Sequence, residues 1–409
     1  MRDEEILIVG AGAAGLSLAY RLCSPPRGGR APTVTLVDAP PGPLRPPERT
    51  WCYWEPPGGE FDEVLACSWG RLRVRGAEGE PVVGRPVDLR YKMLRSGDFE
   101  AFVGRRTDGR PGFRRVVAAV HTVADGPGGA EVRGADAAGE PVVLHGRWAF
   151  DSRPPRRLPP ARTTLLQHFR GWFVRTERPR FDPAVADLMD FRTPQPPRGL
   201  SFGYVLPLSA REALVEYTEF SPAVLDDAAY DRALAHYARQ VLDLGEWEVT
   251  AVEQGVIPMT DARFPRRTGA SVFRIGAAGG ATRPSTGYTF AAVQRQTRAV
   301  ADAWHRGRPP VPPRPHPARF RAMDAVLLRA LAAGRVDGAA FFTGLFRQVP
   351  MERLLRFLDG RTRIGEDMTI GLRTPVPAML RTVAELPWLR RSSPMPSPPD
   401  SARQEATAT

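Results

Sequence analysis

The chain opens with a short run of apolar residues between a charged N-terminus and a glycine-rich turn. Residues 6–9, Ile-Leu-Ile-Val, include no polar position, which is typical of a strand buried on both faces of a parallel sheet. The glycine-rich turn occupies residues 10–15, an apolar stretch that favours a helix follows it, and residues 33–38 have a second strand pattern. This order predicts a βαβ unit at the start of the chain.

Further along, alternating apolar and polar positions predict antiparallel strands and hairpins. The predicted strands lie at residues 71–76, 131–151, 199–220 and 248–258. A helix is predicted between the last two of these, at residues 226–243. Residues 40–55 are predicted to be loop, because prolines interrupt their first part.

The second half of the chain repeats the opening order and then becomes helical. A strand and a glycine turn lead into a predicted helix at about residues 288–305, and a proline-rich segment follows. Residues 319–359 again have a helical pattern. The tail from Ser392 has too few apolar residues to offset the entropy cost of ordering, so we expect it to be disordered.

Composition excludes several classes of protein. The 409 residues have a net charge of +12, and Lys92 is the one lysine, so almost all the basic residues are arginines. Because the arginines are dispersed along the chain, nucleic-acid binding is not expected. A basic surface would also suit an anionic membrane. Three cysteines and six histidines show no ligand spacing, so no metal site or disulfide framework is expected. No apolar run is long enough to cross a bilayer, and acids stand where a signal peptide has positive charge. We expect a cytoplasmic protein, free or peripherally attached to the membrane.

The first glycine turn fits the dinucleotide-binding fingerprint. Gly10 permits a tight turn, Gly12 lets the backbone approach a pyrophosphate, and Gly15 permits close packing of the helix on the strand. The phosphates then lie at the N-terminus of the helix, where unpaired N–H groups favour an anion. An acid that ends the second strand is placed to bind a ribose hydroxyl. The candidate cofactor residues are Gly10, Ala11, Gly12, Ala13, Ala14, Gly15 and Asp38.

A second glycine-rich turn, at residues 276–288, indicates which dinucleotide is bound. A fingerprint at the start of the chain and a later strand-to-helix turn are the arrangement of FAD enzymes, in which the second turn approaches the flavin ring. Gly276, Gly279 and Gly280 supply backbone N–H groups with little side-chain bulk. A purely structural glycine turn is the alternative.

Several motifs together resemble those of the bacterial lycopene β-cyclase family. The similar blocks, between residue 10 and about residue 298, are GAGAAGLSLAYRL, RTWCYWE, YKMLRSGDFEAFV, FDSRP, GYVLPLSAREALVEYTEFS and IGAAGGATRPSTGYTFAAVQRQT. The block FFTGLFRQVPMERLLRFLDG is also similar to the helical C-terminal region of that family. The first block is shared by many flavoproteins, whereas the second and the last are more specific.

The resemblance implies an α/β fold with a Rossmann-like FAD/NAD(P)-binding domain, an interleaved β-sheet substrate domain and a helical C-terminal region. The expected boundaries are 1–95 and 96–160 for the first two parts of the FAD-binding domain, 161–262 for the substrate domain, 263–306 for the last part of the FAD-binding domain, 307–390 for the helical region and 391–409 for a disordered tail.

The resemblance also implies the reaction. It is a redox-neutral cyclisation of the linear ends of lycopene, or of a related acyclic carotenoid, to β-rings, which depends on reduced FAD and on NAD(P)H as the reductant. Whether one end or both are cyclised stays open. An NAD(P)H-driven flavin monooxygenase or prenyl reductase on the same fold is the alternative.

The essential acid of the family lies in a short acidic strand motif, and Glu216 of LVEYT matches that position. Relatives often have a second acid directly after it, where this chain has Tyr217, and the next acid, Glu219, is the second candidate. Strand alternation puts the two glutamates on opposite faces, and they meet only at a bulge or a strand end. The alternative for Glu216 is a solvated surface acid.

Aromatic rings stabilise carbocations, and some of the aromatic residues are candidates to line the site. The candidates are Trp51, Tyr53, Trp54, Trp172, Phe173, Phe202 and Tyr204. Core packing is the alternative for each. Because a long polyene dissolves in lipid, the enzyme is expected to dock on a membrane, and residues 341–358 mix apolar and basic positions either as an interfacial helix or as a core helix.

Overall fold

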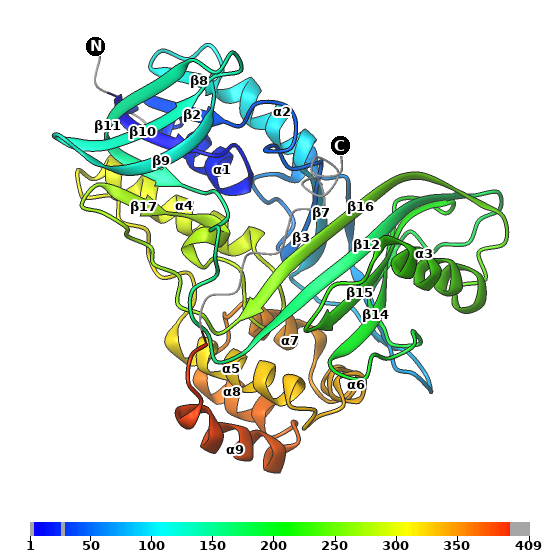
Figure 1. Cartoon of the computed structure of the whole chain (residues 1–409). Helices are drawn as coiled ribbons and strands as arrows, with labels where there is room; N and C mark the ends of the chain where they lie inside the picture. The colour runs from blue at the N-terminus through cyan, green and yellow to red at the C-terminus, as the bar shows by residue number, and fades with distance from the viewer. Residues whose placement is uncertain (1–3, 26–28, 393–409) are drawn as a thin grey trace.

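The computed structural model describes residues 4–25 and 29–392, so the expectation for the tail falls almost wholly outside the described residues. Three sheets and a group of C-terminal helices make up the molecule (Figure 1). The first sheet is at the N-terminal end, a long second sheet extends from it, and the yellow-to-red helices α5–α9 pack below both.

The first sheet has a parallel core with an antiparallel hairpin at one side. Its strands are β8 (Phe113–Val117), β2 (Val34–Asp38), β1 (Glu4–Val9), β11 (Pro141–Asp151), β10 (Gly129–Ala135) and β9 (Ala119–Gly126) in spatial order, with β17 (Val272–Arg274) paired to β11. Strand β1 runs parallel to both β2 and β11. Residues 6–9 are fully buried, as the all-apolar run predicts, and each such side chain stabilises the fold by about 1.5–3 kcal/mol.

Three helices cover this sheet and enclose its core. They are α1 (Ala13–Leu22), α2 (Ser96–Thr107) and α4 (Phe290–His305). Helix α1 follows β1 directly and leads to β2, which confirms the predicted βαβ unit. The short helical turn η3 (Gly276–Gly279) connects β17 to α4 through the second glycine turn.

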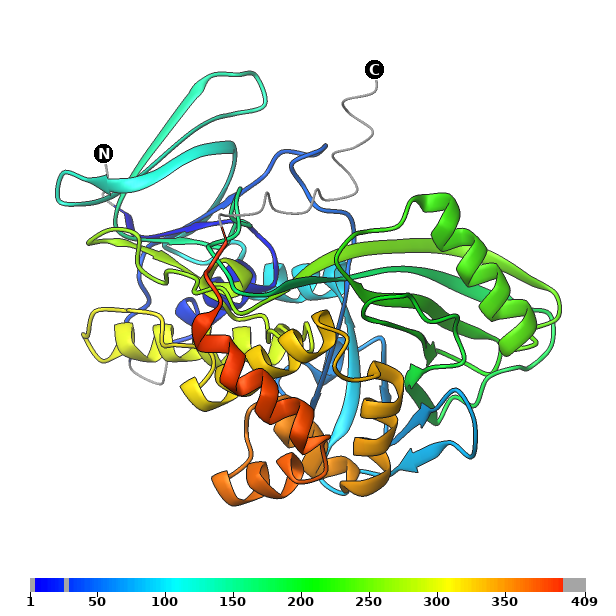
Figure 2. The same ribbon diagram turned by 60° about the horizontal axis from the view of Figure 1, so that its bottom comes forward.

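The second sheet is largely antiparallel and carries the predicted acidic motif. Its strands are β16 (Trp247–Thr260), β12 (Thr164–Thr176), β15 (Glu212–Ser221), β14 (Leu200–Pro207), β13 (Val185–Asp190), β5 (Arg71–Arg75) and β6 (Val82–Gly84) in spatial order. Helix α3 (Asp227–His236) and the π-turn after it (Tyr237–Val241) cover one face (Figure 2). The Asp226 side chain caps α3 by accepting the N–H of Ala229.

The other face of the second sheet packs against the C-terminal helices. These are α5 (Ala318–Ala332), α6 (Gly338–Gln348), α7 (Met351–Leu358), α8 (Ile364–Gly371) and α9 (Val376–Glu385), followed by the turn η4 (Leu386–Trp388). One apolar cluster joins the sheet to α5, α6 and α7. The apolar residues of 341–358 point inward, with Phe342 and Leu355 only 7% and 0% exposed. These residues therefore pack in the core and do not form an interfacial helix.

The third sheet is small and corrects one prediction. It contains β3 (Thr50–Glu55), β7 (Arg90–Arg95) and β4 (Cys67–Trp69) in spatial order, with the turn η1 (Asp62–Val64) beside it. Residues 50–55 were predicted to be loop, which is wrong. The prolines end at Pro47, and the aromatic, strand-favouring residues after them pair with β7 in antiparallel register.

Candidate active site

A cavity of about 210 Å³ lies between the second sheet, the C-terminal helices and the second glycine turn. Its floor is one face of the sheet, because the lining residues of β12 and β15 alternate along each strand. The floor residues are Gln167, Phe169, Phe202, Tyr204, Leu214, Glu216, Thr218, Phe220, Glu253 and Ile257. Phe342, Phe346, Leu355 and Leu358 of α6 and α7 close the cavity on the other side. The space is therefore mostly apolar, with two carboxyl groups in it.

Glu216 lies in the floor of this cavity and is shielded from water. Its side chain is 9% exposed, and Oε1 accepts a hydrogen bond of 2.5 Å from the hydroxyl of Thr218. Burial raises the pKa of Glu216 from 4.5 to about 8; the Thr218 hydrogen bond opposes this rise and the charge of Glu253 adds to it. The group is therefore a neutral acid near pH 7, and the alternative of a solvated strand acid does not hold.

Glu219 lies on the opposite face of β15 and does not line the cavity. The hydroxyl of Tyr217 donates to its Oε2 at 3.2 Å, and Nε2 of His168 is 3.8 Å from its Oε1. Burial also raises the pKa of Glu219. No bulge interrupts the pairing of β15 with β12, so the two glutamates stay apart, as strand alternation predicts.

A second cavity acid, Glu253 of β16, was not predicted from the sequence. Gly171 of β12 pairs with Glu216 on one side and with Glu253 on the other, so the two acids lie in one row across the sheet. The backbone N–H and the hydroxyl of Thr50 donate to the two oxygens of Glu253 at 2.7 and 2.6 Å. The strand at 248–258 was expected, but nothing in its pattern indicates which of its acids faces a cavity.

Aromatic side chains surround the two acids, including four of the seven candidates. Trp51, Trp54, Phe202 and Tyr204 line the cavity, whereas Tyr53, Trp172 and Phe173 do not. Phe220 lines it too, and the sequence reasoning missed Phe169, Tyr288, Phe290, Phe342 and Phe346, which are also in the lining.

Three buried tyrosine hydroxyls are linked at the edge of the cavity. Tyr91 contacts Tyr204 through the hydroxyls and is 2.8 Å from the hydroxyl of Tyr288. Burial raises the pKa of each of them, so they remain neutral. Because Tyr204 is in the same row as Glu216, this chain of hydroxyls begins next to the acid.

The first glycine turn has the shape of a phosphate cradle. Gly10 has a φ of +95°, and a Cβ on Gly15 would lie 1.9 Å from the carbonyl oxygen of Gly10, so the strand and helix pack with no room for a side chain. A Cβ on Gly12 would meet nothing within 4 Å, which leaves the first turn of α1 open to a ligand. No side chain caps α1, so its N–H groups are available to an anion.

The two glycine turns lie against each other, as one cofactor spanning both requires. Gly276 has a φ of +64°, and a Cβ there would lie 2.7 Å from the Cβ of Ala14 in the first turn. The N–H of Gly276 donates to the side-chain oxygen of Gln296 at 2.8 Å, and Gly280 has a φ of +81°. Asp38 ends β2, only 8% exposed, with its Oδ2 3.4 Å from Nη1 of Arg45.

A buried ion pair fixes the far end of the second turn. Nε of Arg283 is 3.1 Å from both oxygens of Asp324 in α5, and Nη1 donates to the carbonyl of Phe357 at 3.0 Å. The hydroxyl of Ser285 also donates to Asp324 at 2.7 Å. These contacts attach the glycine turn to α5 and α7.

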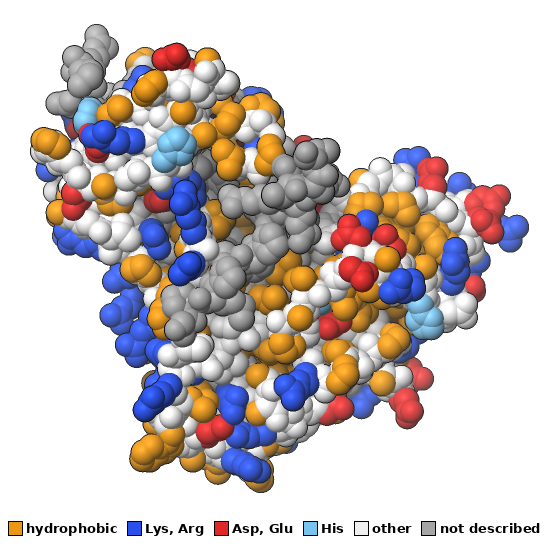
Figure 3. Space-filling view, viewed as in Figure 1, with side chains coloured by type: hydrophobic (Ala, Val, Ile, Leu, Met, Phe, Trp, Pro, Cys, Tyr) orange, Lys and Arg blue, Asp and Glu red, His pale blue; other side chains and the backbone are white. Residues whose placement is uncertain are grey.

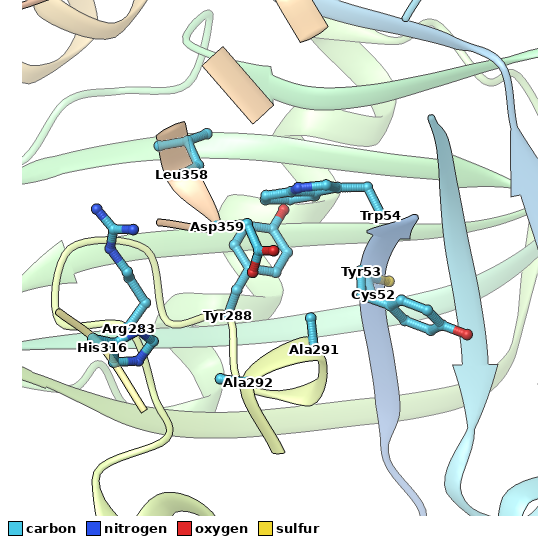
Figure 4. A pocket seen from close by; sticks show the side chains of 10 residues that line it. All are labelled: Cys52, Tyr53, Trp54, Arg283, Tyr288, Ala291, Ala292, His316, Leu358 and Asp359. Carbon is cyan, nitrogen blue, oxygen red and sulfur yellow. The ribbon is translucent and has the colours of Figure 1, made fainter. Parts of the chain in front are cut away.

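A smaller pocket adjoins this turn at the start of α4 (Figure 4). Trp54 and Tyr288 face each other there, edge to face, with ring centroids 4.6 Å apart. Ala291 and Ala292 of α4 line the same pocket with minimal bulk. The indole N–H of Trp54 is buried without a partner among the described residues. Arg283, His316 and Asp359 line this pocket as well, and its open space is about 10 Å³. Its small side chains and the unpaired donor therefore offer a wall that a flat, polar-edged ring could lie against, and not a space that holds a whole flavin.

Neither a metal centre nor a membrane span is found in the part of the chain that the structure describes. Within residues 4–25 and 29–392, no three His, Cys, Asp or Glu side chains gather as metal ligands. None of the described helices is both long and apolar enough to cross a bilayer.

Solved structures with the same architecture define the class of protein. A geranylgeranyl bacteriochlorophyll reductase-like protein from Thermoplasma acidophilum has a TM-score of 0.59 at 12% identity, over 94% of this chain and 99% of that one. The p-nitrophenol 4-monooxygenase PnpA of Pseudomonas putida DLL-E4 has a TM-score of 0.57 at 15% identity, over 96% of this chain and 99% of that one. A flavoprotein/dehydrogenase from Cytophaga hutchinsonii has a TM-score of 0.60 at 12% identity, over 94% of this chain and 100% of that one. At such identities the likeness concerns the fold alone, which is that of the Rossmann-type flavoproteins, and the predicted fold class is confirmed.

A comparison of the sequence with models of protein families assigns the family. The model of the family described as lycopene cyclase protein matches residues 5–384. The chain belongs to the lycopene cyclase family, as its motifs predicted. No curated protein sequence matches it.

Proposed function

We propose that this protein converts the linear ends of lycopene, or of a related acyclic carotenoid, to β-ionone rings without net redox change. The observation that carries the proposal is Glu216, a neutral carboxyl group in the floor of an apolar, aromatic cavity. Membership of the lycopene cyclase family supports a carotenoid as the substrate.

The residues of the cavity can carry out the first steps of such a cyclisation. An alkene is a weak base, so the acid that protonates it has to be oriented and desolvated, as Glu216 is. The cation that forms is stabilised by aromatic faces such as Trp54 and Phe169. The apolar side chains of α6 and α7 cover one side of the cavity and limit the access of water, which would otherwise trap the cation as an alcohol.

We also propose FAD, in its reduced form, as the cofactor, with NAD(P)H as the reductant. The first glycine turn and Asp38 would hold the dinucleotide, and the second turn with the start of α4 would lie against the ring. The positive φ angles of Gly10, Gly276 and Gly280 and the open space beside Gly12 support this fit. When bound, a reduced flavin supplies negative charge that stabilises a nearby cation.

The reaction is tested by expressing the chain in cells that accumulate lycopene and analysing their pigments. We expect cyclic carotenoids with β-rings, and no net consumption of NAD(P)H or oxygen per ring when the purified enzyme turns over. The alternative is a monooxygenase or a prenyl reductase, both of which occur on this fold. Oxygen uptake or NAD(P)H use equal to the product formed would establish that alternative.

For access to a substrate dissolved in lipid, we propose that one exposed face docks on an anionic membrane surface. This α8–α9 face consists of Ile364, Met368, Leu372, Leu380, Val383 and Trp388, which are 50–87% exposed. Arg373, Arg381 and Arg390 are exposed among them, and Figure 3 shows apolar and basic side chains together at this lower end of the molecule. Apolar area beside positive charge is what binding to anionic lipid requires.

Vesicle sedimentation tests the α8–α9 face. Binding to vesicles that contain phosphatidylglycerol is expected to fall at high salt and in Leu372→Glu and Leu380→Glu. Val252→Glu, at a half-exposed valine of β16, is the matched control and should bind normally. Equal binding by all three variants would exclude this face, and absence of vesicle binding by the unmodified chain would exclude the membrane surface altogether.

A further inference from the structure

The cavity holds two buried carboxyl groups, and the proposed function uses one of them. Glu253 is 8% exposed and lines the same cavity as Glu216. Both residues pair directly with Gly171, one from each side, and residues opposite each other in a row lie on the same face of a sheet. Since neighbouring strands are about 4.8 Å apart, the Cα atoms of the two acids are separated by about 10 Å.

Position 171, between the two acids, has no side chain of its own, and the side chain of Leu214 packs against it. A Cβ on Gly171 would lie 2.8 Å from Cδ1 of Leu214 and in ordinary contact, at 3.5 Å, with Cβ of Glu216, so a larger residue would displace the Leu214 side chain. A substrate end placed over this glycine would have one carboxyl group on each side. The row thus places one carboxyl group on each side of the same position in the cavity floor.

The two acids differ in their hydrogen bonds. Both oxygens of Glu253 accept hydrogen bonds from Thr50, and an ionised carboxylate is the form that only accepts. Glu216 accepts one hydrogen bond, from Thr218, and its proton is favoured by burial and by the negative charge of Glu253. Two carboxyl groups that share one cavity and have different hydrogen-bond partners are the arrangement of an acid and a base.

We propose that Glu253 is the base that removes the proton from the ring cation, while Glu216 is the acid that starts the reaction; this rests on the proposed cyclisation. The proton of Glu216 forms a new C–H bond with the terminal alkene, and Glu216 becomes a carboxylate. Attack by the next double bond closes the ring and moves the positive charge to a tertiary carbon. Glu253 takes a proton from the neighbouring ring carbon, the C–H electron pair becomes the ring double bond, and the proton later returns to Glu216. No electron and no proton is consumed overall.

The position of the base decides which double bond forms. A tertiary ring cation has three kinds of neighbouring C–H group, a ring CH, a ring CH₂ and a methyl group, and loss of a proton from each gives a different isomer. A base fixed on one side of the substrate selects one of them. This outcome separates a base from a residue that only maintains the structure.

The experiment compares Glu253→Gln with Glu253→Asp in the full-length chain, by rate and by isomer ratio. We expect Glu253→Gln to fold and bind flavin, to cyclise about 10²-fold more slowly, and to release a larger share of the non-β isomers. Glu253→Asp retains a carboxylate and should regain part of both the rate and the ratio. Glu248→Gln, at an exposed acid of the same strand, is the control and should behave normally.

The outcomes that contradict the proposal are distinct. A normal rate and pure β product from Glu253→Gln would leave Glu216 to act alone, and a lower rate with an unchanged isomer ratio would assign Glu253 a structural role. If Glu253→Gln does not fold, the test rests on Glu253→Asp, which moves the carboxylate away from the substrate. A normal cyclisation rate and a normal isomer ratio in Glu253→Asp would exclude Glu253 as a base whose position selects the product. Absence of ring formation by the unmodified chain would instead reject the proposed function itself.

Discussion

The two faces of strand β15 carry buried glutamates only three residues apart, and the faces differ in what surrounds the carboxyl group. Glu216 has one hydrogen-bond donor and otherwise faces an apolar cavity. Glu219 lies under helix α3, where Tyr217 donates to it and His168 is nearby. Burial raises the pKa of both groups, so burial alone does not mark a reactive acid. What distinguishes Glu216 is the open space in front of it.

The largest expected effect is the loss of cyclisation in Glu216→Gln. The amide keeps the shape of the side chain but has no proton to donate, so the rate should fall by about 10²–10⁴-fold while flavin remains bound. Glu219→Gln is the matched variant on the other face and should cyclise within a few-fold of the unmodified enzyme. Pigment analysis and flavin absorbance measure both properties. Equal losses in the two variants would remove the difference between the two faces.

The pH dependence of the rate is expected to show the same acid. Because burial raises the pKa of Glu216 to about 8, the group is protonated below pH 8 and loses its proton above it. The cyclisation rate should therefore fall about tenfold per pH unit above pH 8. Glu219→Gln should show the same fall of the cyclisation rate above pH 8, since Glu219 lies outside the cavity. A rate that stays constant up to pH 10 would contradict the assignment of Glu216 as the acid.

The pH dependence of stability should follow from the same group with a smaller effect. In the unfolded chain Glu216 loses its proton near pH 4.5, whereas in the fold it keeps the proton up to about pH 8. The unfolded state is thus favoured progressively as pH rises from 4.5 through 8, by at most about 5 kcal/mol. Urea denaturation of Glu216→Gln between pH 5 and 9 should show a smaller loss of stability than the unmodified chain. A loss of the same size would mean that other groups cause it.

The glycine turns could be predicted because their signals are local, whereas Glu216 was proposed because its LVEYT motif resembles the acidic motif of the family. An all-apolar strand before Gly10-x-Gly12-x-x-Gly15 defines the cradle within a few residues, and alternation along 214–220 separates the two glutamates correctly. Which face of β15 borders a cavity depends on helices α6 and α7, more than a hundred residues later in the chain. Alternation alone does not contain that information.

The parts that the sequence did not reveal depend on long-range register. Glu253 faces the cavity because β16 pairs with β12 in one particular register, with an irregularity between Phe173 and Val174. The pattern of 341–358 is the same for a helix that faces a core and one that faces lipid, and packing against the second sheet decides between them. The exposed apolar face lies further on, in α8 and α9, which are within the expected helical region 307–390 but were not singled out in it.

The smallest expected effect comes from removing the hydrogen bond between Tyr217 and Glu219, which lies on the α3 side of β15. Tyr217→Phe removes the hydroxyl that donates to Glu219 and leaves a buried carboxyl group with one donor fewer, which should cost about 1–3 kcal/mol of stability. Because Tyr217 points away from the cavity, the cyclisation rate should not change. Thr218→Val is the counterpart on the cavity side, since it removes the donor to Glu216, and it should alter the pH profile of the rate by raising the pKa of the acid further. Thermal denaturation and rate profiles of the two variants measure these changes. A change in the pH profile of Tyr217→Phe, or none in that of Thr218→Val, would mean that the two faces of the strand are not chemically separate.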